Sequence, residues 1–352
     1  MSSPQIPLTE DFYLSSQFPD ITMRADGPAQ VEMKIGTETF FSQTYYPDAD
    51  GHFVMGDVAS LVSAEMENRS LDLVRIDIVL TDCNGDSVTK GANVLYCNCE
   101  IDTPEDGDPF YMSFLPNNFL TSTAVRIVNP DFVGWLRFLL QSAETAEVHY
   151  FVTWSADGKP VQTDELEGME QNYAAQDDPV IIGLTVDIPR IIASVRASLS
   201  EGKIPTIHSL QVRAGNRSAM FYTTEKPLPD RFVFRNMFGS YDFIQLSLET
   251  VEKRKTEVST ASVGRFVQTY DRHTEQSFEA TASGLDTEQA VLMADMLASS
   301  QVFKSEHQIL ITDASPELKI RSTDLNQIKF TYRYSAVTPS LRIDESGKII
   351  LN

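Results

Sequence analysis

Cysteine and histidine are scarce in this sequence, which has three cysteines and five histidines among 352 residues. Three cysteines do not match the disulfide framework that stabilises small secreted domains. The histidines are scattered, without the close spacing of two ligands to one metal ion: His52, His149, His208, His273 and His307. His149 lies in a strand-like run, so we expect it to be packed or exposed rather than catalytic. The sequence therefore predicts no metal centre and no cofactor.

Basic residues are also few, with 28 Lys and Arg against 50 Asp and Glu, which gives a formal net charge of -22. A charge of this sign and size repels phosphate backbones and anionic lipid headgroups. The one dense basic group is formed by Lys253, Arg254 and Lys255, and it is flanked by the acidic side chains Glu249, Glu252 and Glu257. We expect no nucleic-acid partner and no membrane partner.

Long apolar runs are absent, since nowhere do 18 uninterrupted apolar residues occur. Residues 1–20 lack a basic segment followed by the apolar run of a secretory signal. The expected location is therefore the cytoplasm, with virion association if the protein is a component of such a particle.

Motifs of nucleophilic and phosphate-binding enzymes are missing: the sequence has no Gly-x-Ser-x-Gly and no Gly-x-x-x-x-Gly-Lys-Ser/Thr. We therefore predict that the protein is not an enzyme and name no catalytic residue. One enzymatic alternative stays open, a β-sandwich hydrolase that uses two carboxylates facing each other across a cleft. Such a site would contain an acid of raised pKa beside an ionised partner.

Three patterns could in principle hold a metal ion. Cys97 and Cys99 place two thiols on one strand face, within reach of Cys83 across a hairpin. Oxygen ligands alternate at Asp82, Asn84 and Asp86, but the glycine is Gly85, whereas a calcium loop has it one residue after the third ligand, and no glutamate falls at the twelfth position. The acidic residues between 163 and 179 form the third pattern. We interpret them as reduced thiols, a tight turn and a solvated loop, and predict no metal ligand.

Signals for β-structure dominate what is present. Turn dipeptides recur between strand-like stretches: Asp50-Gly51, Asn84-Gly85, Asp157-Gly158 and Ser346-Gly347. The stretches themselves alternate apolar and polar residues or are rich in β-branched residues: residues 73–80, 147–154, 209–212 and 329–334. The predicted fold class is mainly β, with tandem β-sandwich or barrel-like domains and a few short helices.

Three short helices are predicted from their caps and apolar stripes. Asp57 and Asp187 stand where N-caps are expected, and Asp286 with Gln289 forms the pattern of a capping box. Residues 132–140 fit helical spacing as well as strand, and we favour a strand that forms a hairpin with the next one.

Composition divides the chain into four regions. An N-terminal tail covers residues 1–17 and a first β domain residues 18–109, which ends in an acidic loop. The second β domain covers residues 110–228 and contains a long exposed acidic loop at 163–179. The third covers residues 229–352, after a linker with two prolines, and contains a short helix near 287–299.

Aromatic residues cluster next to turns or in expected strands: Phe40, Phe41, Tyr45, Tyr46, Phe232, Phe234, Phe238, Tyr241 and Phe243. Most of them are expected in the core. A minority could form an adhesive surface, which keeps open a carbohydrate- or protein-binding adhesin as a second function.

Four stretches of the C-terminal region carry a resemblance: residues 231–239 (RFVFRNMFG), 297–303 (LASSQVF), 308–313 (QILITD) and 325–334 (LNQIKFTYRY). Residues 40–56, before the first predicted helix, add to it. The arrangement resembles uncharacterised β-rich proteins of prophage-like gene clusters in Bacteroidetes, which are described as tail or virion structural proteins. The resemblance implies a non-enzymatic tail, baseplate or adaptor protein that packs against copies of itself or against other structural proteins.

Overall fold

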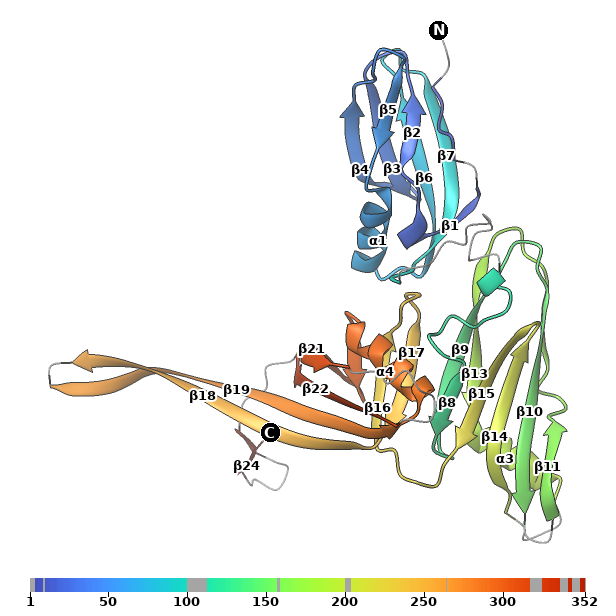
Figure 1. Ribbon diagram of the computed structural model, residues 1–352, viewed down its shortest axis with the longest axis vertical. Helices are drawn as coiled ribbons and strands as arrows, with labels where there is room; N and C mark the ends of the chain where they lie inside the picture. The colour runs from blue at the N-terminus through green and yellow to red at the C-terminus, as the bar shows by residue number, and fades with distance from the viewer. Residues whose placement is uncertain are drawn as a thin grey trace.

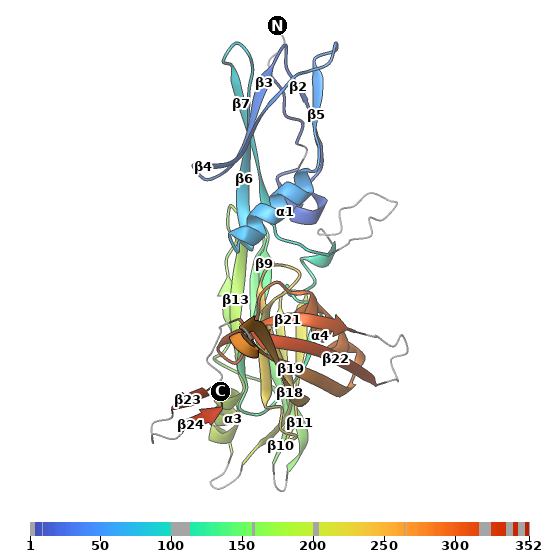
Figure 2. The ribbon, with the colours of Figure 1, turned by 90° about the vertical axis from the view of Figure 1, so that its left-hand side faces the viewer.

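The computed structural model describes residues 4–8, 10–99, 113–156, 159–199, 204–263, 265–316, 325–335, 341–343 and 349–351. The protein is mainly β, as predicted, with three bounded helices in the described part. Its buried apolar side chains form three large clusters, one in each of three successive parts of the chain, and a smaller cluster where these parts meet. Figures 1 and 2 show the first part at one end of the molecule and the other two side by side.

The first part has a five-stranded sheet of order β1-β7-β6-β3-β4 and a two-stranded sheet of β2 and β5. Its elements are β1 (Phe12–Leu14), β2 (Ile21–Arg24), β3 (Ala29–Ile35), β4 (Glu38–Tyr45), β5 (His52–Met55), α1 (Val58–Asn68), β6 (Leu73–Thr81) and β7 (Ser87–Leu95). Alternate residues of β3 and β6, such as Val31 and Ile78, point into the core against Val62 and Met66 of α1.

Residues expected to form an N-terminal tail contribute to this part. β1 pairs in parallel with β7, and Leu8, Tyr13 and Leu14 are buried. Burial of these apolar side chains in the core is more favourable than their exposure to water in a solvated tail. The Asp50-Gly51 turn also differs from expectation, because it connects β4 to β5, which pairs with β2 rather than with β4.

The second part is a β-sandwich. Its larger sheet has the order β11-β10-β14-β15-β8, with β12 also paired to β10, and its smaller sheet contains β13 and β9. The elements are β8 (Val125–Val128), β9 (Val133–Leu140), β10 (Ala146–Ala156), β11 (Lys159–Glu165), β12 (Gln171–Tyr173), β13 (Val180–Asp187), α3 (Ile188–Ala197), β14 (Thr206–Ala214) and β15 (Arg217–Thr223). Trp154 and Phe221 of the larger sheet belong to the same buried cluster as Phe138 and Val186 of the smaller one.

Two expectations for this part need correction. The stretch 132–140 is a strand, but β9 pairs along its whole length with β13, and β10 pairs with β11, β12 and β14 instead. The acidic stretch 163–179 is only partly a loop, because it includes the end of β11 and all of β12. Leu166 is buried there, and its backbone N–H donates to the carbonyl of Tyr150 at 2.8 Å, which holds the stretch against the sandwich.

The third part is a seven-stranded antiparallel sheet of order β17-β16-β20-β21-β22-β19-β18. Its elements are β16 (Asp230–Arg235), β17 (Tyr241–Leu246), β18 (Leu248–Val263), β19 (Phe266–Leu285), α4 (Thr287–Ala298), β20 (Val302–Lys304), β21 (His307–Ser315) and β22 (Asn326–Tyr334). Met293 and Met296 of α4 pack with Phe232 and Phe330 of the sheet. A separate short pair, β23 (Leu341–Ile343) and β24 (Ile349–Leu351), follows.

The helix predictions are confirmed at all three sites, with one difference in capping. Asp187 accepts from the backbone N–H of Arg190 at the start of α3, and Asp286 and Gln289 form the predicted capping box of α4. Asp57 precedes α1 but has a left-handed backbone (φ 58°) and makes no side-chain cap.

β18 and β19 form the most unusual feature of the fold. They pair with each other from Leu248↔Ala282 to Val263↔Phe266, whereas the pairing of β19 with β22 stops at Phe278↔Tyr332. The hairpin beyond that pair, residues 253–277, is called the distal arm below. Figure 1 shows β18 and β19 projecting away from the rest of the molecule.

Candidate functional site

The turn between β16 and β17, residues 236–240, lies where the three parts meet, and we call it the wedge turn. The backbone N–H of Asn236 donates to the carbonyl of Ser240 at 2.8 Å, which closes the turn. Gly239 has a φ of 75°, and a Cβ there would lie 3.1 Å from the side chain of Tyr96. The position therefore requires glycine both for its left-handed backbone and for the close approach of the first part.

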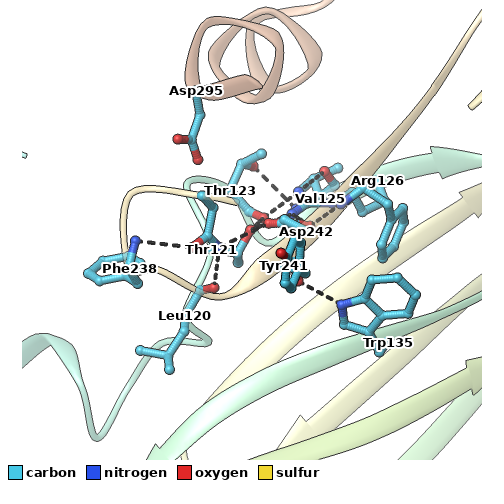
Figure 3. A network of polar contacts seen from close by, with 12 residues as sticks. Leu120, Thr121, Thr123, Val125, Arg126, Trp135, Phe238, Tyr241, Asp242 and Asp295 are labelled. Atoms are coloured by element: carbon cyan, nitrogen blue, oxygen red, sulfur yellow. Dashed lines mark hydrogen bonds and ion pairs between the residues drawn. The ribbon is translucent and has the colours of Figure 1, made fainter. Parts of the chain in front are cut away.

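A buried ion pair joins the second and third parts (Figure 3). The guanidinium of Arg126, at the start of β8, lies 3.0 Å from the carboxylate of Asp242 on β17, and their side chains are only 3% and 7% exposed. Thr121 links them, because its hydroxyl donates to Asp242 and accepts from Arg126. The indole N–H of Trp135 donates to the carbonyl of Tyr241 at 2.6 Å beside this pair.

The wedge turn makes further bonds to both neighbouring parts. The Asn236 side chain donates to the carbonyl of Leu120 at 2.7 Å in the second part. The carbonyl of Met237 accepts from the backbone N–H of Asn98 at 2.8 Å in the first part. Arg235, just before the turn, donates to the carbonyl of Leu71 at 2.8 Å, and its guanidinium lies 4.5 Å from the centre of the Tyr96 ring.

An apolar cluster lies in the same junction and draws its residues from all three parts: Leu14, Leu95 and Cys97 from the first, Leu115, Leu120 and Leu139 from the second, and Phe238 from the third. Burial of apolar surface together with buried hydrogen bonds is typical of a permanent contact. The junction therefore holds the three parts in a fixed arrangement.

Among the described carboxylates of the junction, Asp295 of α4 has the most strongly shifted pKa. Its Oδ1 accepts from the backbone N–H of Met237 at 3.1 Å, whereas its buried Oδ2 has no partner among the described residues. Burial, followed by the negative charge of Asp242, raises the pKa of Asp295 to about 7. A raised-pKa acid beside an ionised carboxylate is the arrangement that a two-carboxylate hydrolase would need.

The space around Asp295 decides between a catalytic and a structural interpretation. The cavity at this position has a volume of about 40 Å³ and is lined by Tyr96, Asn98, Asn236 and Ser299, among others. Sites for small molecules are typically clefts of roughly 300–1,000 Å³. The cavity has room for water but not for a sugar unit, so the geometry favours a structural role for the pair.

We predict that Asp295→Asn stabilises the protein above neutral pH. The unfolded carboxyl loses its proton near pH 3.8 and the folded one near pH 7, so the folded state loses stability as pH rises through that window. The variant lacks this penalty, and it should gain about 1–3 kcal/mol at pH 8.5 but much less at pH 5. Thermal unfolding of both proteins at the two pH values measures the difference.

The matched control for this prediction is Asp313→Asn, because Asp313 lies exposed on β21 of the same part. Its unfolding temperature should follow that of the unmodified protein at both pH values. Equal pH dependence of the Asp295→Asn variant and the unmodified protein would show that Asp295 is not protonated in the folded state.

The residues considered as metal ligands either lie far from one another or form hydrogen bonds with the backbone. Asp82 accepts from the backbone N–H groups of Asn84 (2.8 Å) and Asp86 (2.9 Å), which is the tight-turn interpretation. Cys83 is exposed in this turn, at the opposite end of β7 from Cys97 and Cys99. Among the described residues, no three His, Cys, Asp or Glu side chains are placed to hold a metal ion.

Cys97 and Cys99 form a close pair of free thiols, with their sulfur atoms 3.2 Å apart. A hydrogen bond with the Cys99 thiol lowers the pKa of Cys97 to about 7. The backbone of Cys97 is held by Ser15, whose hydroxyl accepts from its N–H at 3.0 Å and donates to its carbonyl at 3.2 Å.

The remaining candidate residues are in ordinary surface or core positions. His149 lies partly exposed on β10, where the Glu165 carboxylate, 2.6 Å from Nδ1, raises the pKa of the imidazole. The basic group on β18 is paired with carboxylates, Lys253 with Glu279, Arg254 with Glu252 and Lys255 with Glu257. Of the nine aromatic residues singled out, four are fully buried, Phe232, Phe234, Phe238 and Phe243, and three more, Phe40, Phe41 and Tyr45, are partly buried against the core of the first part.

The junction residues and the distal arm were not found from the sequence. Arg126, Asp242 and Asp295 stand far apart in the chain, and none belongs to a recognisable motif. The sequence signal at the wedge turn is the stretch 231–239 with Gly239, which carries a resemblance but does not indicate a junction. In the described part of the chain, no helix is long and apolar enough to span a membrane.

Comparison with known proteins adds little. No protein-family model matches the sequence, and no match was found among curated proteins. One similar solved structure is that of a 1.5-MDa bacterial ice-binding adhesin, with 10% identity over 80% of this chain and 92% of that one and a TM-score of 0.17. Another is the SGBP-B protein of the Bacteroides ovatus mixed-linkage glucan utilization locus, with 12% identity over 90% and 73% and a TM-score of 0.18.

A third similar structure is the α2-macroglobulin of E. coli, with 9% identity over 80% of this chain and 21% of that one and a TM-score of 0.20. These three proteins differ in what their names say they do. At such TM-scores the superpositions carry no argument about this chain.

Proposed function

We propose that this chain is a non-enzymatic structural subunit that assembles with copies of itself, and that the distal arm is its assembly element. The observation that carries the proposal is an arm with no described strand beside it other than its own hairpin partner. The junction contributes by holding the three parts rigid, so that the arm projects in a defined direction.

The arm is longer than an isolated hairpin can readily sustain. Residues 253–263 of β18 extend roughly 35 Å beyond the last β22 pairing at 3.3 Å per residue. A lone two-stranded hairpin is marginally stable in water, and an open strand edge is a template for pairing with another chain. Such a feature is expected to be completed by a partner.

The tip of the arm presents apolar side chains to solvent. Phe266 is 74% exposed and Val267 is 70% exposed, and Val258 is exposed as well. Apolar side chains exposed at the end of a long polar arm lower the solubility of the free subunit and do not stabilise its fold. Burial against a partner would recover this cost.

Charge indicates that the partner is another copy of the acidic chain. The distal arm contains five basic residues and three acidic ones, whereas the chain as a whole has 28 basic and 50 acidic residues. Bodies of two copies therefore repel each other, whereas the arm, which carries charges of both signs, can approach another copy without this repulsion.

The particular assembly that we propose is a phage tail or baseplate of the kind that the resemblance implies, with the free subunit in the cytoplasm and the assembled one in the virion. An adhesin is less well supported. It would need an aromatic platform, but the strongly exposed aromatic side chains among the described residues lie at separate places: Tyr46 after β4, Tyr222 on β15 and Phe266 on the arm.

The test is the molar mass of the full chain by light scattering after size exclusion, over a wide concentration range, with negative-stain microscopy of the peak. We expect multiples of the 39.4 kDa protomer that form rings, tubes or short filaments. In an arm-deleted variant, Asn-Gly replaces residues 253–277 and joins Glu252 to Phe278, which already pair across the hairpin. This variant should stay monomeric and folded.

Point variants provide a matched control. Phe266→Ser should weaken assembly at least tenfold in concentration, because a large apolar side chain leaves the contact. Tyr46→Ser removes an aromatic group that is 77% exposed at the far end of the molecule, and it should leave assembly unchanged. A chain that is monomeric at every concentration, with the arm intact, would overturn the proposal.

A further inference from the structure

We propose that the arms of neighbouring copies lie side by side, so that the open edge of β18 in one copy pairs antiparallel with the distal part of β19, residues 266–277, in the next. This inference rests on the proposed self-assembly and adds which two edges meet. It commits to a second copy of this chain as the partner.

Apart from the distal arm, the described sheet of the third part has one end that is covered and one that is open. At the β17 end, the second part covers the edge: Trp135 donates to the carbonyl of Tyr241, and the backbone N–H of Asn129 donates to the Gln245 side chain at 3.0 Å. At the other end, no described strand pairs with the outer side of β18. Along the body of the sheet, a partner strand can therefore add at the outer side of β18.

The arm itself has two open edges of different sequence. On one side is the outer edge of β18, and on the other side is the outer edge of β19 before Phe278, where the pairing with β22 begins. In each arm, β18 runs from the body toward the tip and β19 runs back. Two arms that point in the same direction therefore bring β18 of one copy beside β19 of the next. Their strands then run antiparallel, which continues the pattern of the hairpin.

Charge favours this pairing over a two-fold pairing of β18 with β18. In a two-fold arrangement centred on Arg254, the basic residues Lys253, Arg254 and Lys255 would face the same three residues of the other copy. Like charges directly opposite each other destabilise a sheet. Beside the distal part of β19, the same triplet instead meets a stretch of mixed charge that contains Asp271, Arg272 and Glu275.

The pairing has a consequence for the shape of the assembly. Because the two edges differ, the contact is heterologous, and each copy offers both halves of it. Repetition gives either a closed ring, whose arms form a continuous barrel without edges, or an open filament. A two-fold dimer is excluded as the basic unit.

Cysteine cross-linking of mixed chains tests which edges meet. In a Cys83→Ser background, one chain carries Ser259→Cys or Thr260→Cys on β18, and a second, longer-tagged chain carries Gln268→Cys or Thr269→Cys on β19. The two positions on each strand are neighbours in sequence, and neighbouring residues of a strand alternate between its faces, so one pair fits whichever face the register brings together. Directly opposite residues lie within disulfide reach, and a short bismaleimide covers a small shift.

We expect cross-linked product between the two kinds of chain at least tenfold above that from either chain alone. The background without added cysteine is the matched control. Products between two β18 cysteines, or between two β19 cysteines, would overturn the pairing while leaving self-assembly intact. Assembly by light scattering with no arm cross-link at all would do the same, whereas a monomer in both measurements would overturn the pairing and the proposed function together.

Discussion

Replacing Arg217 by methionine is expected to lower the free energy of unfolding of the second part by about 3–5 kcal/mol. The Arg217 side chain is 0% exposed. It donates to both oxygens of Glu144, at 2.7 and 3.2 Å, and to the carbonyls of Leu115 and Leu139 at 2.9 and 2.7 Å. Methionine fills a similar volume but leaves all of these acceptors without their donor.

The position of the tryptophans makes this prediction measurable. The chain has two tryptophans, Trp135 on β9 and Trp154 on β10, and both lie in the second part. Their fluorescence during urea or thermal denaturation therefore reports the unfolding of this part within the full chain. We expect the transition of Arg217→Met to move to lower urea concentration and lower temperature than that of the unmodified protein.

Two further variants separate the ion pair from simple loss of packing. Arg213→Met removes an exposed arginine of the same sandwich, whose guanidinium lies 4.8 Å from the Phe151 ring, and it should cost less than about 1 kcal/mol. Arg217→Met combined with Glu144→Gln should cost less than the sum of the single changes, because the charged partner is gone as well. Additive costs would mean that the pair is not coupled.

Much of the fold could be predicted because it depends on local patterns. The alternation in residues 73–80 and 147–154 gave β6 and β10, and the capping box at Asp286 gave the start of α4. A strand with one buried face shows an alternation of apolar and polar residues that can be recognised in the sequence. A capping box likewise marks the first turn of a helix by two residues that are close in sequence.

Strand partners were harder to predict, since pairing is decided by distant residues. β9 and β10 are adjacent in sequence, yet β9 pairs with β13 across the sandwich, as Leu136↔Leu184 shows. The apolar residues of β9 fit the core in either arrangement, so their spacing does not choose between them. β1 escaped notice because three residues are too few to show a period.

The distal arm escaped notice for the opposite reason. Its β18 residues from Lys253 to Glu257 are exposed on both faces, so no apolar period marks a strand. The charged run predicts a solvated surface when it is interpreted alone. A strand that is polar on both faces is recognised only when its neighbours are known.

Loss of the ion pair between Arg126 and Asp242 is expected to separate the second and third parts without unfolding either. Arg126→Met or Asp242→Asn leaves one buried charge without its partner, at a cost of about 3–5 kcal/mol to the contact. Most of each apolar cluster lies within one part, although Phe243 of β17 packs into the cluster of the second part, so each part should keep its own unfolding transition. We expect calorimetry to show two resolved transitions where the unmodified protein shows overlapping ones.

Trp135 reports the separation directly, because its indole N–H donates to the carbonyl of Tyr241 in the third part. Once the contact loosens, Trp135 becomes accessible to acrylamide, whereas Trp154 stays buried against Asp164. Quenching of the native variant should therefore rise before any unfolding transition. Unchanged quenching and unchanged calorimetry in both variants would mean that the ion pair does not hold the junction.

The matched control is Arg137→Met, which removes the ion pair of Arg137 with Asp72 between the first and second parts. That pair is 2.8 Å long but partly exposed, and solvent screens it, so its loss should cost under about 1 kcal/mol and leave Trp135 protected. A loosened junction should also weaken self-assembly, because the distal arm would no longer project in a fixed direction from the rest of the subunit. Assembly of Arg126→Met at the same concentration as Arg137→Met would show instead that the arm acts independently of the junction.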